Sequence, residues 1–316
     1  MESELVFSNY DKTNGFDLSL VIPTYRNKQL LFSAINSIIS LKKEKDICYE
    51  VIVVSNNPDD PLDDLVSKYK DVRFNFAVYR NKKNYGQVGN INQGIQLAKG
   101  KYVALLHDDD LLLPNYLISV KKYIKSEYDY SCIIASFYMM GEKYSYDYKH
   151  HFLSAVTCVR YLYRRKIQKI LPKDVIYSFY DVYSAPTCGT LFLKKAIEDF
   201  GYFKNEHGAA WDFYNYRMFN KCNEIFLLHK YIGIRRTESG MSNESKVQRE
   251  FYEDRVSMVK NEIGENSFIK KYNPTFFTKK PFIKYVVFRI RTRLYFYLHN
   301  LDSNIGIPKK MFSNYN

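Results

Sequence analysis

Short apolar runs alternate with helical patterns over the first part of the chain, and this alternation restricts the fold more than any other feature. We expect strands at 18–22, 50–54, 72–79, 102–106 and 132–137. We expect helices at 30–39, 61–69, 88–98 and 114–125, with Gly100 as the C-cap of the third. Such alternation produces a mostly parallel sheet with helices on both faces, so the sequence predicts an α/β fold.

The second half of the chain has a less regular pattern. It predicts a strand at 188–193, a helix at 211–222 and a strand at 225–231. A polar loop at 233–243 and an amphipathic helix at 244–262 are expected to follow.

Three consecutive carboxylates, Asp108, Asp109 and Asp110, directly follow the apolar run 102–106. Adjacent acids at the end of a strand repel one another and cost stability unless a cation shares them. Mg²⁺ and Mn²⁺ prefer such oxygen ligands, and ligands of open α/β sheets bind beyond the carboxyl ends of strands. The alternative is a solvated acidic turn before the helix that begins near Pro114.

Two other loops follow strands of the same predicted sheet, at 23–27 and 55–60. The carboxyl ends of parallel strands meet at one edge of a sheet. We therefore expect these two loops to form one pocket with residues 107–110.

The chain has a net charge of +13, from 47 basic and 34 acidic residues. This charge attracts an anionic partner, which includes nucleic acid, acidic lipid and phosphorylated substrates. The three aspartates disfavour nucleic acid, because they would repel phosphates without a metal. The five cysteines form no CxxC pair, which favours a reducing cytosol over a disulfide framework or zinc site. We see no signal peptide, and no apolar run approaches the roughly 18–20 residues of a transmembrane helix.

The composition shifts to cations interleaved with aromatic residues in the C-terminal tail, 266–316. A single acid, Asp302, accompanies ten lysines and arginines there. This mixture suits contact with an anionic membrane surface. The alternative is an ordinary helix that packs its aromatic face onto the domain.

Several short motifs share an order and spacing that are informative together. They are Val21-Ile-Pro-Thr-Tyr25, the loop after Val54, Asn84-x-Gly86, Asn92-x-Gly94-Ile95, Ala98-x-Gly100-x-Tyr102 and His107-Asp-Asp-Asp110. This set resembles family 2 glycosyltransferases, closely over 17–125 and more weakly to about 245. The resemblance implies the Rossmann-like GT-A fold over 1–265, with nucleotide-sugar binding at 17–125 and acceptor binding at 126–265.

The resemblance also implies an activity, which is inverting transfer of a sugar from a nucleotide-diphosphate donor, expected to be a UDP-hexose, to an acceptor hydroxyl. The residues expected to hold the base and ribose are Pro23, Thr24, Tyr25, Asn56, Asn84, Gly86 and Asp108. Asn56 replaces the aspartate that contacts the base in the family, and an amide can also pair with a pyrimidine edge.

The metal motif of the family departs from its usual form, because His107 occupies the position of the first aspartate. The resemblance then makes Asp109 the ligand of Mn²⁺ or Mg²⁺, with Asp110 in support. The motif can also be placed as Asp108-x-Asp110, and spacing leaves both assignments open. The ion would bridge the diphosphate and stabilise charge on the leaving group.

A catalytic base is needed because an alcohol is a poor nucleophile. The resemblance places this base at Asp212, with Trp211 in place of the usual glutamate and Gly189 close to the acceptor. The alternative for Asp212 is a residue that satisfies N–H groups at a helix start. Arg235 and Arg236 resemble a segment near the diphosphate, where arginines bind phosphate oxygens; the alternative is a solvated basic turn.

We therefore expect a cytoplasmic enzyme, peripheral on the inner face of the cell membrane. Its expected acceptor is a polyprenyl-diphosphate-linked saccharide, in surface polysaccharide assembly such as capsule or O-antigen. One alternative is a sugar nucleotidyltransferase, which would carry a glycine-rich basic loop where residues 23–27 have no glycine. Another is a non-catalytic binder of membranes or nucleic acid, driven by the positive charge.

Overall fold

The computed structural model describes residues 1–10, 15–140, 188–223 and 225–236, together with residues 247, 250 and 254. The chain divides into two units, 1–143 with 181–258, and 144–180 with 259–316. All described residues belong to the first unit. The helix expected at 244–262 lies almost entirely outside the described residues, and the tail at 266–316 lies wholly outside them.

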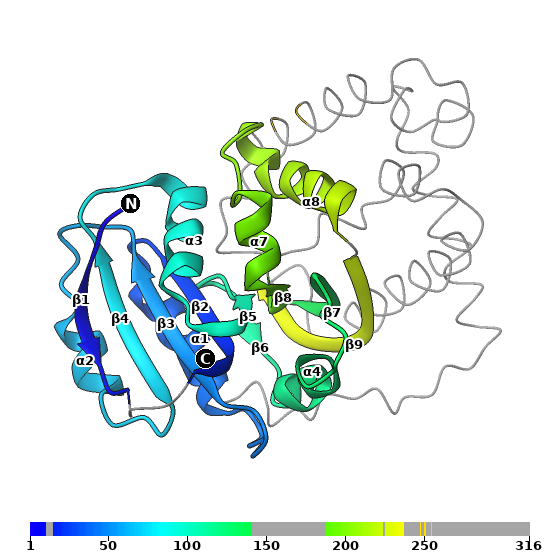
Figure 1. Cartoon of the computed structure of the whole chain (residues 1–316). Coiled ribbons are helices and arrows are strands. Elements are labelled where there is room, and N and C mark those ends of the chain that lie inside the picture. The colour runs from blue at the N-terminus through cyan, green and yellow to red at the C-terminus, as the bar shows by residue number, and fades with distance from the viewer. Residues whose placement is uncertain are drawn as a thin grey trace. The chain divides into compact units, whose positions relative to one another are not determined.

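The described residues form nine strands in one sheet (Figure 1). The strands are β1 (Ser3–Ser8), β2 (Phe16–Thr24), β3 (Tyr49–Ser55), β4 (Asn75–Asn81), β5 (Gly100–Leu105), β6 (Leu111–Leu112), β7 (Cys132–Met140), β8 (Thr190–Leu193) and β9 (Ile225–Arg236). Their order is β1-β4-β3-β2-β5-β8-β7-β9-β6. Strands β4, β3, β2 and β5 run parallel, whereas β1 and β8 run antiparallel to β4 and β5. The parallel centre confirms the α/β fold expected from the alternation.

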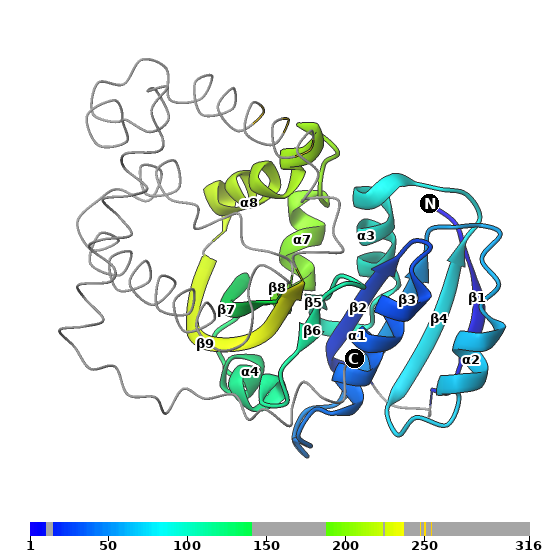
Figure 2. The same ribbon diagram turned by 180° about the vertical axis from the view of Figure 1, so that it is seen from behind.

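Helices cover both faces of the parallel strands, with α1 on one face and α3 on the other (Figures 1 and 2). The helices are α1 (Lys28–Ile39), α2 (Asp63–Tyr69), α3 (Gly86–Leu97), α4 (Tyr116–Ile124), α7 (Lys194–Phe200) and α8 (Trp211–Cys222). Successive side chains of a strand point to opposite faces. Accordingly, Leu20 of β2 joins the apolar cluster that includes Ile35 of α1, and Val21 lies under α3. A Cβ on Gly94 of α3 would overlap Val21 Cγ1, so glycine lets this helix approach the sheet.

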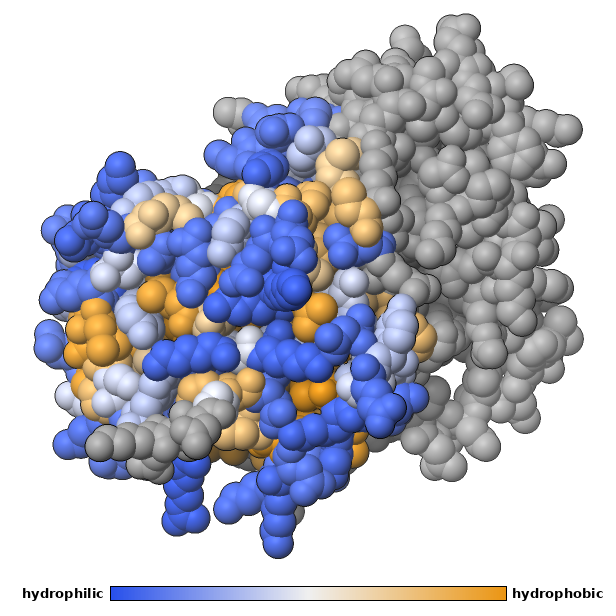
Figure 3. Space-filling model, in the orientation of Figure 1, coloured by the Kyte–Doolittle hydropathy of each residue, from blue (hydrophilic) through white to orange (hydrophobic). Residues whose placement is uncertain are grey.

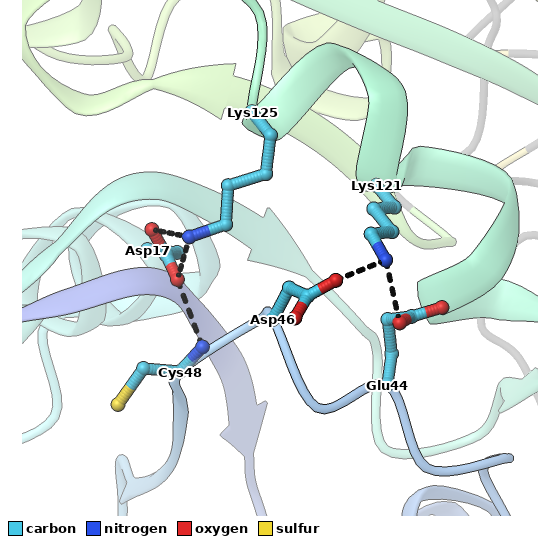
Figure 4. Close-up of polar contacts among 6 residues, drawn as sticks. All are labelled: Asp17, Glu44, Asp46, Cys48, Lys121 and Lys125. Carbon is cyan, nitrogen blue, oxygen red and sulfur yellow. Dashed lines mark hydrogen bonds and ion pairs between the residues drawn. The ribbon is translucent and has the colours of Figure 1, made fainter.

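Ion pairs fix α4 to the start of β2 and to the segment that leads into β3 (Figure 4). Lys121 Nζ lies 2.8 Å from Glu44 Oε1 and 2.5 Å from Asp46 Oδ2. Lys125 Nζ lies 2.8 Å from both carboxylate oxygens of Asp17. Because these side chains are partly exposed, solvent screens their attraction, and they orient the helix more than they stabilise the fold.

The described surface is mostly hydrophilic in the view of Figure 3, and its hydrophobic residues form separate patches. The exposed large hydrophobic side chains are Met1, Leu5, Tyr25, Ile39, Ile118 and Tyr128. Within the described ranges, none of the helices has the length and apolar character needed to cross a membrane.

Most expected boundaries shift by one to three residues. Two further differences have a local physical cause. Gly100 does not cap α3 but begins β5, where a Cβ would lie 2.6 Å from the backbone N of Ser19. Glycine therefore permits the close approach of β2 and β5. The strand expected at 225–231 continues to Arg236, because β7 and β6 pair with its last residues. The sequence pattern does not predict strands β1 and β6 or helix α7.

Candidate active site

The three loops predicted to share one edge of the sheet do meet there. Thr24, the last residue of β2, donates from Oγ1 to Oδ2 of Asp108 at 2.6 Å. The backbone N–H of Asn56, just beyond β3, donates to the Thr24 carbonyl at 3.0 Å. The backbone N–H of Leu106, just beyond β5, donates to the Val21 carbonyl at 3.0 Å. Parallel pairing of the three strands thus brings their following loops into direct contact.

Of the three carboxylates at this edge, Asp110 is buried, and Asp108 and Asp109 are partly buried. Burial raises the pKa of Asp108 to about 6, although the hydrogen bond from Thr24 opposes this effect. Asp110 is 3% exposed, and its burial, together with the negative charge of Asp109, raises its pKa well above the usual range. Ionisation of neighbouring buried carboxylates destabilises the folded protein unless a cation lies between them. The arrangement therefore favours a bound cation.

Arg235 and Arg236 end β9 and do not lie in the polar loop expected at 233–243. The backbone N–H of Arg236 donates to Oδ1 of Asp110 at 3.3 Å, which ties the end of β9 to the carboxylates. The guanidinium atoms Nε and Nη2 of Arg236 are buried and have no hydrogen-bond partner among the described residues. Burial lowers the pKa of Arg236, while Asp109 and Asp110 act in the opposite direction. Buried donors of this kind require an acceptor, and phosphate oxygens fit a guanidinium.

The carboxylates fit a divalent ion whose coordination is completed by a bound substrate and water. Across the described ranges, no group of three or more His, Cys, Asp or Glu side chains is arranged to hold a metal. Mg²⁺ is commonly held by one or two carboxylates, with substrate phosphates and water as the remaining ligands. Asp109 and Asp110 match this donor set, with the free guanidinium donors of Arg236 close by.

Asn56 does not have the role expected of it, because its amide is fully used inside the protein. Its Nδ2 donates to Oδ1 of Asn84 at 2.7 Å and to the Gly86 carbonyl at 3.1 Å. Its Oδ1 accepts from Nδ2 of Asn81 at 3.0 Å and from the backbone N–H of Tyr85 at 2.9 Å. An amide offers two N–H donors and two acceptor lone pairs, so nothing remains for a base edge. The expected contact between Asn56 and the base is corrected on this ground.

Asn56 belongs to a buried asparagine network, defined by Asn56, Asn81 and Asn90. Asn81 donates from Nδ2 to Oδ1 of Asn90 at 2.9 Å as well as to Asn56. Asn90 donates in turn to the carbonyls of Thr24 at 3.3 Å and Val54 at 3.1 Å. The network therefore joins β4 and α3 to the ends of β2 and β3. No sequence pattern marked Asn81 or Asn90, because isolated asparagines carry no periodic signal.

The turn after β2 presents an aromatic ring at this edge. Pro23 is buried within β2, and Tyr25 is 40% exposed. The guanidinium carbon of Arg26 lies 4.6 Å from the centroid of the Tyr25 ring. Arg26 has a left-handed φ of 73°, which turns the chain sharply after Tyr25. An exposed ring in this position can stack on a nucleotide base.

Gly189 is buried among the described residues. Its φ is 70°, and a Cβ would lie 2.9 Å from Leu112 Cδ2. Its N–H donates to the Leu105 carbonyl at 2.7 Å, and its carbonyl accepts from the Tyr116 hydroxyl at 3.1 Å. Glycine is required here by backbone conformation and packing, and the expected acceptor contact stays a prediction.

Helix α8 begins at Trp211 and carries Asp212, half-buried, in its first turn. Trp211 is only 7% exposed, and its ring centroid lies 6.2 Å from that of Phe203. Trp211 therefore contributes to packing, and its expected role at the acceptor stays a prediction. The helix start predicted at Trp211 agrees with the structure.

A hollow of about 710 Å³ lies at the opposite edge of the sheet, near Gly15, Gly100, Lys101, Asp129 and Lys194. Two of its lysines are already engaged. Lys101 pairs with Asp129 at 2.6 Å, and Lys194 donates to the Ala98 carbonyl at 2.6 Å. We place the site at the carboxylate edge because the unpaired buried donors and the clustered acids are there.

The sequence model described as Glycosyl transferase family 2 matches residues 19–201, more than half of the chain. The chain belongs to glycosyl transferase family 2. Among the curated relatives of this family member is a GalNAc(5)-diNAcBac-PP-undecaprenol beta-1,3-glucosyltransferase of Campylobacter jejuni. It is 33% identical over 122 residues, which is 37% of this chain and 38% of the relative. The chain spans about two fifths of the length of the first curated relatives that it matches.

Solved glycosyltransferase structures share the fold of this family 2 member. The structure of S. aureus TarS 1-349 in complex with UDP-GlcNAc has a TM-score of 0.55 and 17% identity, and the match covers 82% of this chain and 71% of that chain. The mannosyltransferase PcManGT from Pyrobaculum calidifontis, in complex with GDP-Man and Mn²⁺, has a TM-score of 0.55 and 13% identity, with 80% and 66% covered. At these identities the likeness concerns the fold, and it confirms the GT-A architecture expected from the motifs.

Proposed function

We propose that this family 2 member is an inverting glycosyltransferase that moves a sugar from a nucleotide-diphosphate donor to a saccharide acceptor. The observation that carries the proposal is a pair of buried guanidinium nitrogens of Arg236, Nε and Nη2, which have no partner among the described residues and lie beside the carboxylates Asp109 and Asp110. Carboxylates attract a divalent ion, and a guanidinium binds phosphate oxygens. A metal-bound diphosphate is the ligand that uses both groups at once.

The donor nucleoside would lie across the ends of β2, β3 and β5. Asp108, already oriented by Thr24, can accept a hydrogen bond from a ribose hydroxyl. The exposed ring of Tyr25 offers a stacking face for the base. Because the amide of Asn56 is consumed internally, base recognition falls to backbone groups of the loops at 55–60 and 84–86. We propose a UDP-sugar as the donor, supported by UDP-GlcNAc in the TarS structure.

The proposed reaction is a single displacement. Asp212 takes the proton from the acceptor hydroxyl, whose oxygen attacks the anomeric carbon opposite the nucleotide. The bond to the diphosphate breaks as the new glycosidic bond forms, so an α-linked donor gives a β product. Arg235 and Arg236 hold the departing diphosphate. A bound Mn²⁺ or Mg²⁺ supplies charge neutralisation at the diphosphate.

We propose a lipid-linked saccharide as acceptor and a place in surface polysaccharide assembly. The Campylobacter relative carries PP-undecaprenol in the name of its substrate, which supports an acceptor of this chemistry. The basic tail at 266–316 would bring the enzyme to the inner face of the cell membrane. The domain bounds of 1–265 and 266–316 are part of this proposal.

The proposal is tested with the full chain, Mn²⁺ and a panel of UDP-, GDP- and dTDP-sugars. We expect metal-dependent release of the nucleoside diphosphate from one donor. A chain that forms nucleotide sugar from a sugar phosphate and a nucleoside triphosphate, with release of pyrophosphate, is a nucleotidyltransferase instead. A chain that neither binds nor turns over any donor of the panel overturns the proposal.

The base assignment is tested with Asp212→Asn, which keeps the shape of the side chain and removes its ability to take a proton. We expect transfer to fall by about 10²–10⁴-fold while donor affinity stays within about twofold. Asp199→Asn, at an exposed position of α7, is the control and should keep full activity. Full transfer by Asp212→Asn would show that another group is the base.

A further inference from the structure

The segment between α7 and α8 has an unusual backbone. Left-handed φ angles occur at Gly201 (81°), Tyr202 (64°), His207 (62°) and Gly208 (42°). Residues with a side chain avoid this region, and they remain there only where surrounding contacts fix them. This segment leads directly into the first turn of α8, which carries Asp212. Contacts that hold the segment therefore also hold Asp212.

One set of such contacts comes from α3. The Asn92 side chain, 8% exposed, forms two hydrogen bonds with the backbone of Phe203. Its Nδ2 donates to the Phe203 carbonyl at 2.8 Å, and its Oδ1 accepts from the Phe203 N–H at 3.1 Å. Both backbone groups of Phe203 are thus satisfied by one amide, in the manner of a strand partner.

A second set comes from α8 and binds the next residue along the chain. The Asn215 side chain is fully buried, and its Oδ1 accepts from the Lys204 N–H at 2.7 Å. Its Nδ2 donates to the carbonyls of Lys204 and Trp211, both at 2.7 Å. Asn215 therefore ties the segment to the first turn of its own helix.

The two amides link the donor edge to the helix of the proposed base. Helix α3 begins at Gly86, whose carbonyl is bound by Asn56 at the donor edge. Helix α8 begins at Trp211, whose carbonyl is bound by Asn215. Phe203 is hydrogen-bonded to Asn92 of α3, and the next residue, Lys204, is hydrogen-bonded to Asn215 of α8. These two adjacent residues therefore connect the two helices. We call Asn92 and Asn215 with these two residues the asparagine clamp.

We infer that Asn92 and Asn215 are positioning residues that fix Asp212 relative to the donor site. This inference rests on the proposed function, in which Asp212 is the base. A primary amide places a donor and an acceptor side by side, as the N–H and C=O of one extended residue do, so an apolar side chain of similar size leaves buried backbone groups unpaired. A reacting group misplaced by about 1 Å can lose about 100-fold in rate, although it contacts no altered residue. The clamp therefore acts on the rate of transfer more than on donor binding.

The test compares Asn92→Ala and Asn215→Ala with Asn223→Ala in the full chain. Asn223 donates to the Phe219 carbonyl at 3.3 Å at the far end of α8, so its removal also costs a hydrogen bond but leaves Asp212 in place. The rate is measured as Mn²⁺-dependent hydrolysis of whichever sugar among UDP-GlcNAc, UDP-glucose and GDP-mannose the wild-type chain cleaves fastest. Binding of the corresponding nucleoside diphosphate with Mn²⁺ is measured by calorimetry.

We expect each clamp variant to lose about 10–100-fold in the rate at saturating donor, with nucleotide affinity within about twofold of wild type. Asn223→Ala should have the rate and the nucleotide affinity of the wild-type chain. If an alanine variant fails to fold, as judged by circular dichroism, Asn92→Ser and Asn215→Ser, which keep a polar group, replace it in the comparison.

Two outcomes overturn the inference while the proposed function stands. One is a clamp variant with the rate of Asn223→Ala, and the other is a loss of rate matched by an equal loss of nucleotide affinity. A wild-type chain that neither binds nor turns over any donor of the UDP-, GDP- and dTDP-sugar panel overturns the proposed function and, with it, this inference.

Discussion

Hydrogen bonds from asparagine side chains fix the loops at the carboxyl ends of β2 and β3, where the nucleotide donor is proposed to bind. Thr24 and Asp108 could be predicted as site residues because each directly follows a strand, which is a local signal. The saturation of Asn56 could not be predicted, because Asn81 and Asn84 lie 25 and 28 positions away along the chain. Sequence spacing indicates which residues stand at an edge, whereas the direction of an amide depends on such distant partners.

Asn81→Ala tests the asparagine network. Asn81 is fully buried, and its loss leaves the acceptor atoms of Asn56 and Asn90 without a shared donor. We expect a loss of about 1–3 kcal/mol in the free energy of unfolding. We also expect weaker nucleotide binding, because the loops at 55–60 and 84–86 lose their anchor.

Urea unfolding and nucleotide titration measure the two effects. The control is Asn115→Ala, at an exposed position whose side chain forms no cap hydrogen bond with α4. Equal stability of the two variants would show that the network contributes nothing.

Strand β9 is longer in the structure than the sequence predicts, and the extra residues belong to the site. Gly233 and the polar residues after it indicate a loop, yet the strand continues to Arg236. The glycine is needed because a Cβ there would lie 2.6 Å from Cys188 Sγ and 3.0 Å from the Leu111 carbonyl oxygen. Close approach of neighbouring strands and a turn both select glycine, so sequence alone does not separate them. The extension of β9 is what places Arg236 beside Asp110.

Gly233→Ala tests this account of the element. We expect a loss of about 1–3 kcal/mol in the free energy of unfolding, because the added methyl group overpacks the contact with Cys188. Cys188→Ala in the same chain should recover part of that loss, since it removes the sulfur and leaves the Leu111 carbonyl. A double-mutant cycle by thermal or urea unfolding measures the coupling. Strictly additive losses would contradict the proposed contact.

At the scale of the whole molecule, the α/β class could be predicted because each parallel strand is followed by its helix in the sequence. The order β8-β7-β9-β6 could not be predicted, since it depends on pairing between segments far apart in the chain. The net charge of +13 is likewise a property of the whole chain. This charge favours anionic partners. We propose that the site binds a nucleotide-diphosphate donor and that the C-terminal tail binds an anionic membrane surface.

The membrane proposal predicts that the full chain binds vesicles containing anionic lipid and releases them as salt is raised. Replacing Lys279, Lys280, Lys284 and Arg289 with glutamine should weaken binding by at least about 100-fold, because each cation near the surface contributes about 1 kcal/mol. Co-sedimentation with vesicles measures this binding. Equal binding to neutral vesicles, or an unchanged variant, would contradict surface contact by the tail.

The central claim is that a metal-bound diphosphate occupies the edge where Asp109 and Asp110 meet Arg236. Calorimetric titration of the full chain with UDP, GDP and dTDP, each with and without Mn²⁺, tests it most directly. We expect at least one nucleotide to bind only with Mn²⁺, and Arg236→Gln to weaken that binding by about 10–100-fold through the loss of charged hydrogen bonds. Lys101→Gln, at the opposite edge of the sheet, should change nothing. Binding that is independent of Mn²⁺, or unaffected by Arg236→Gln, would contradict the claim.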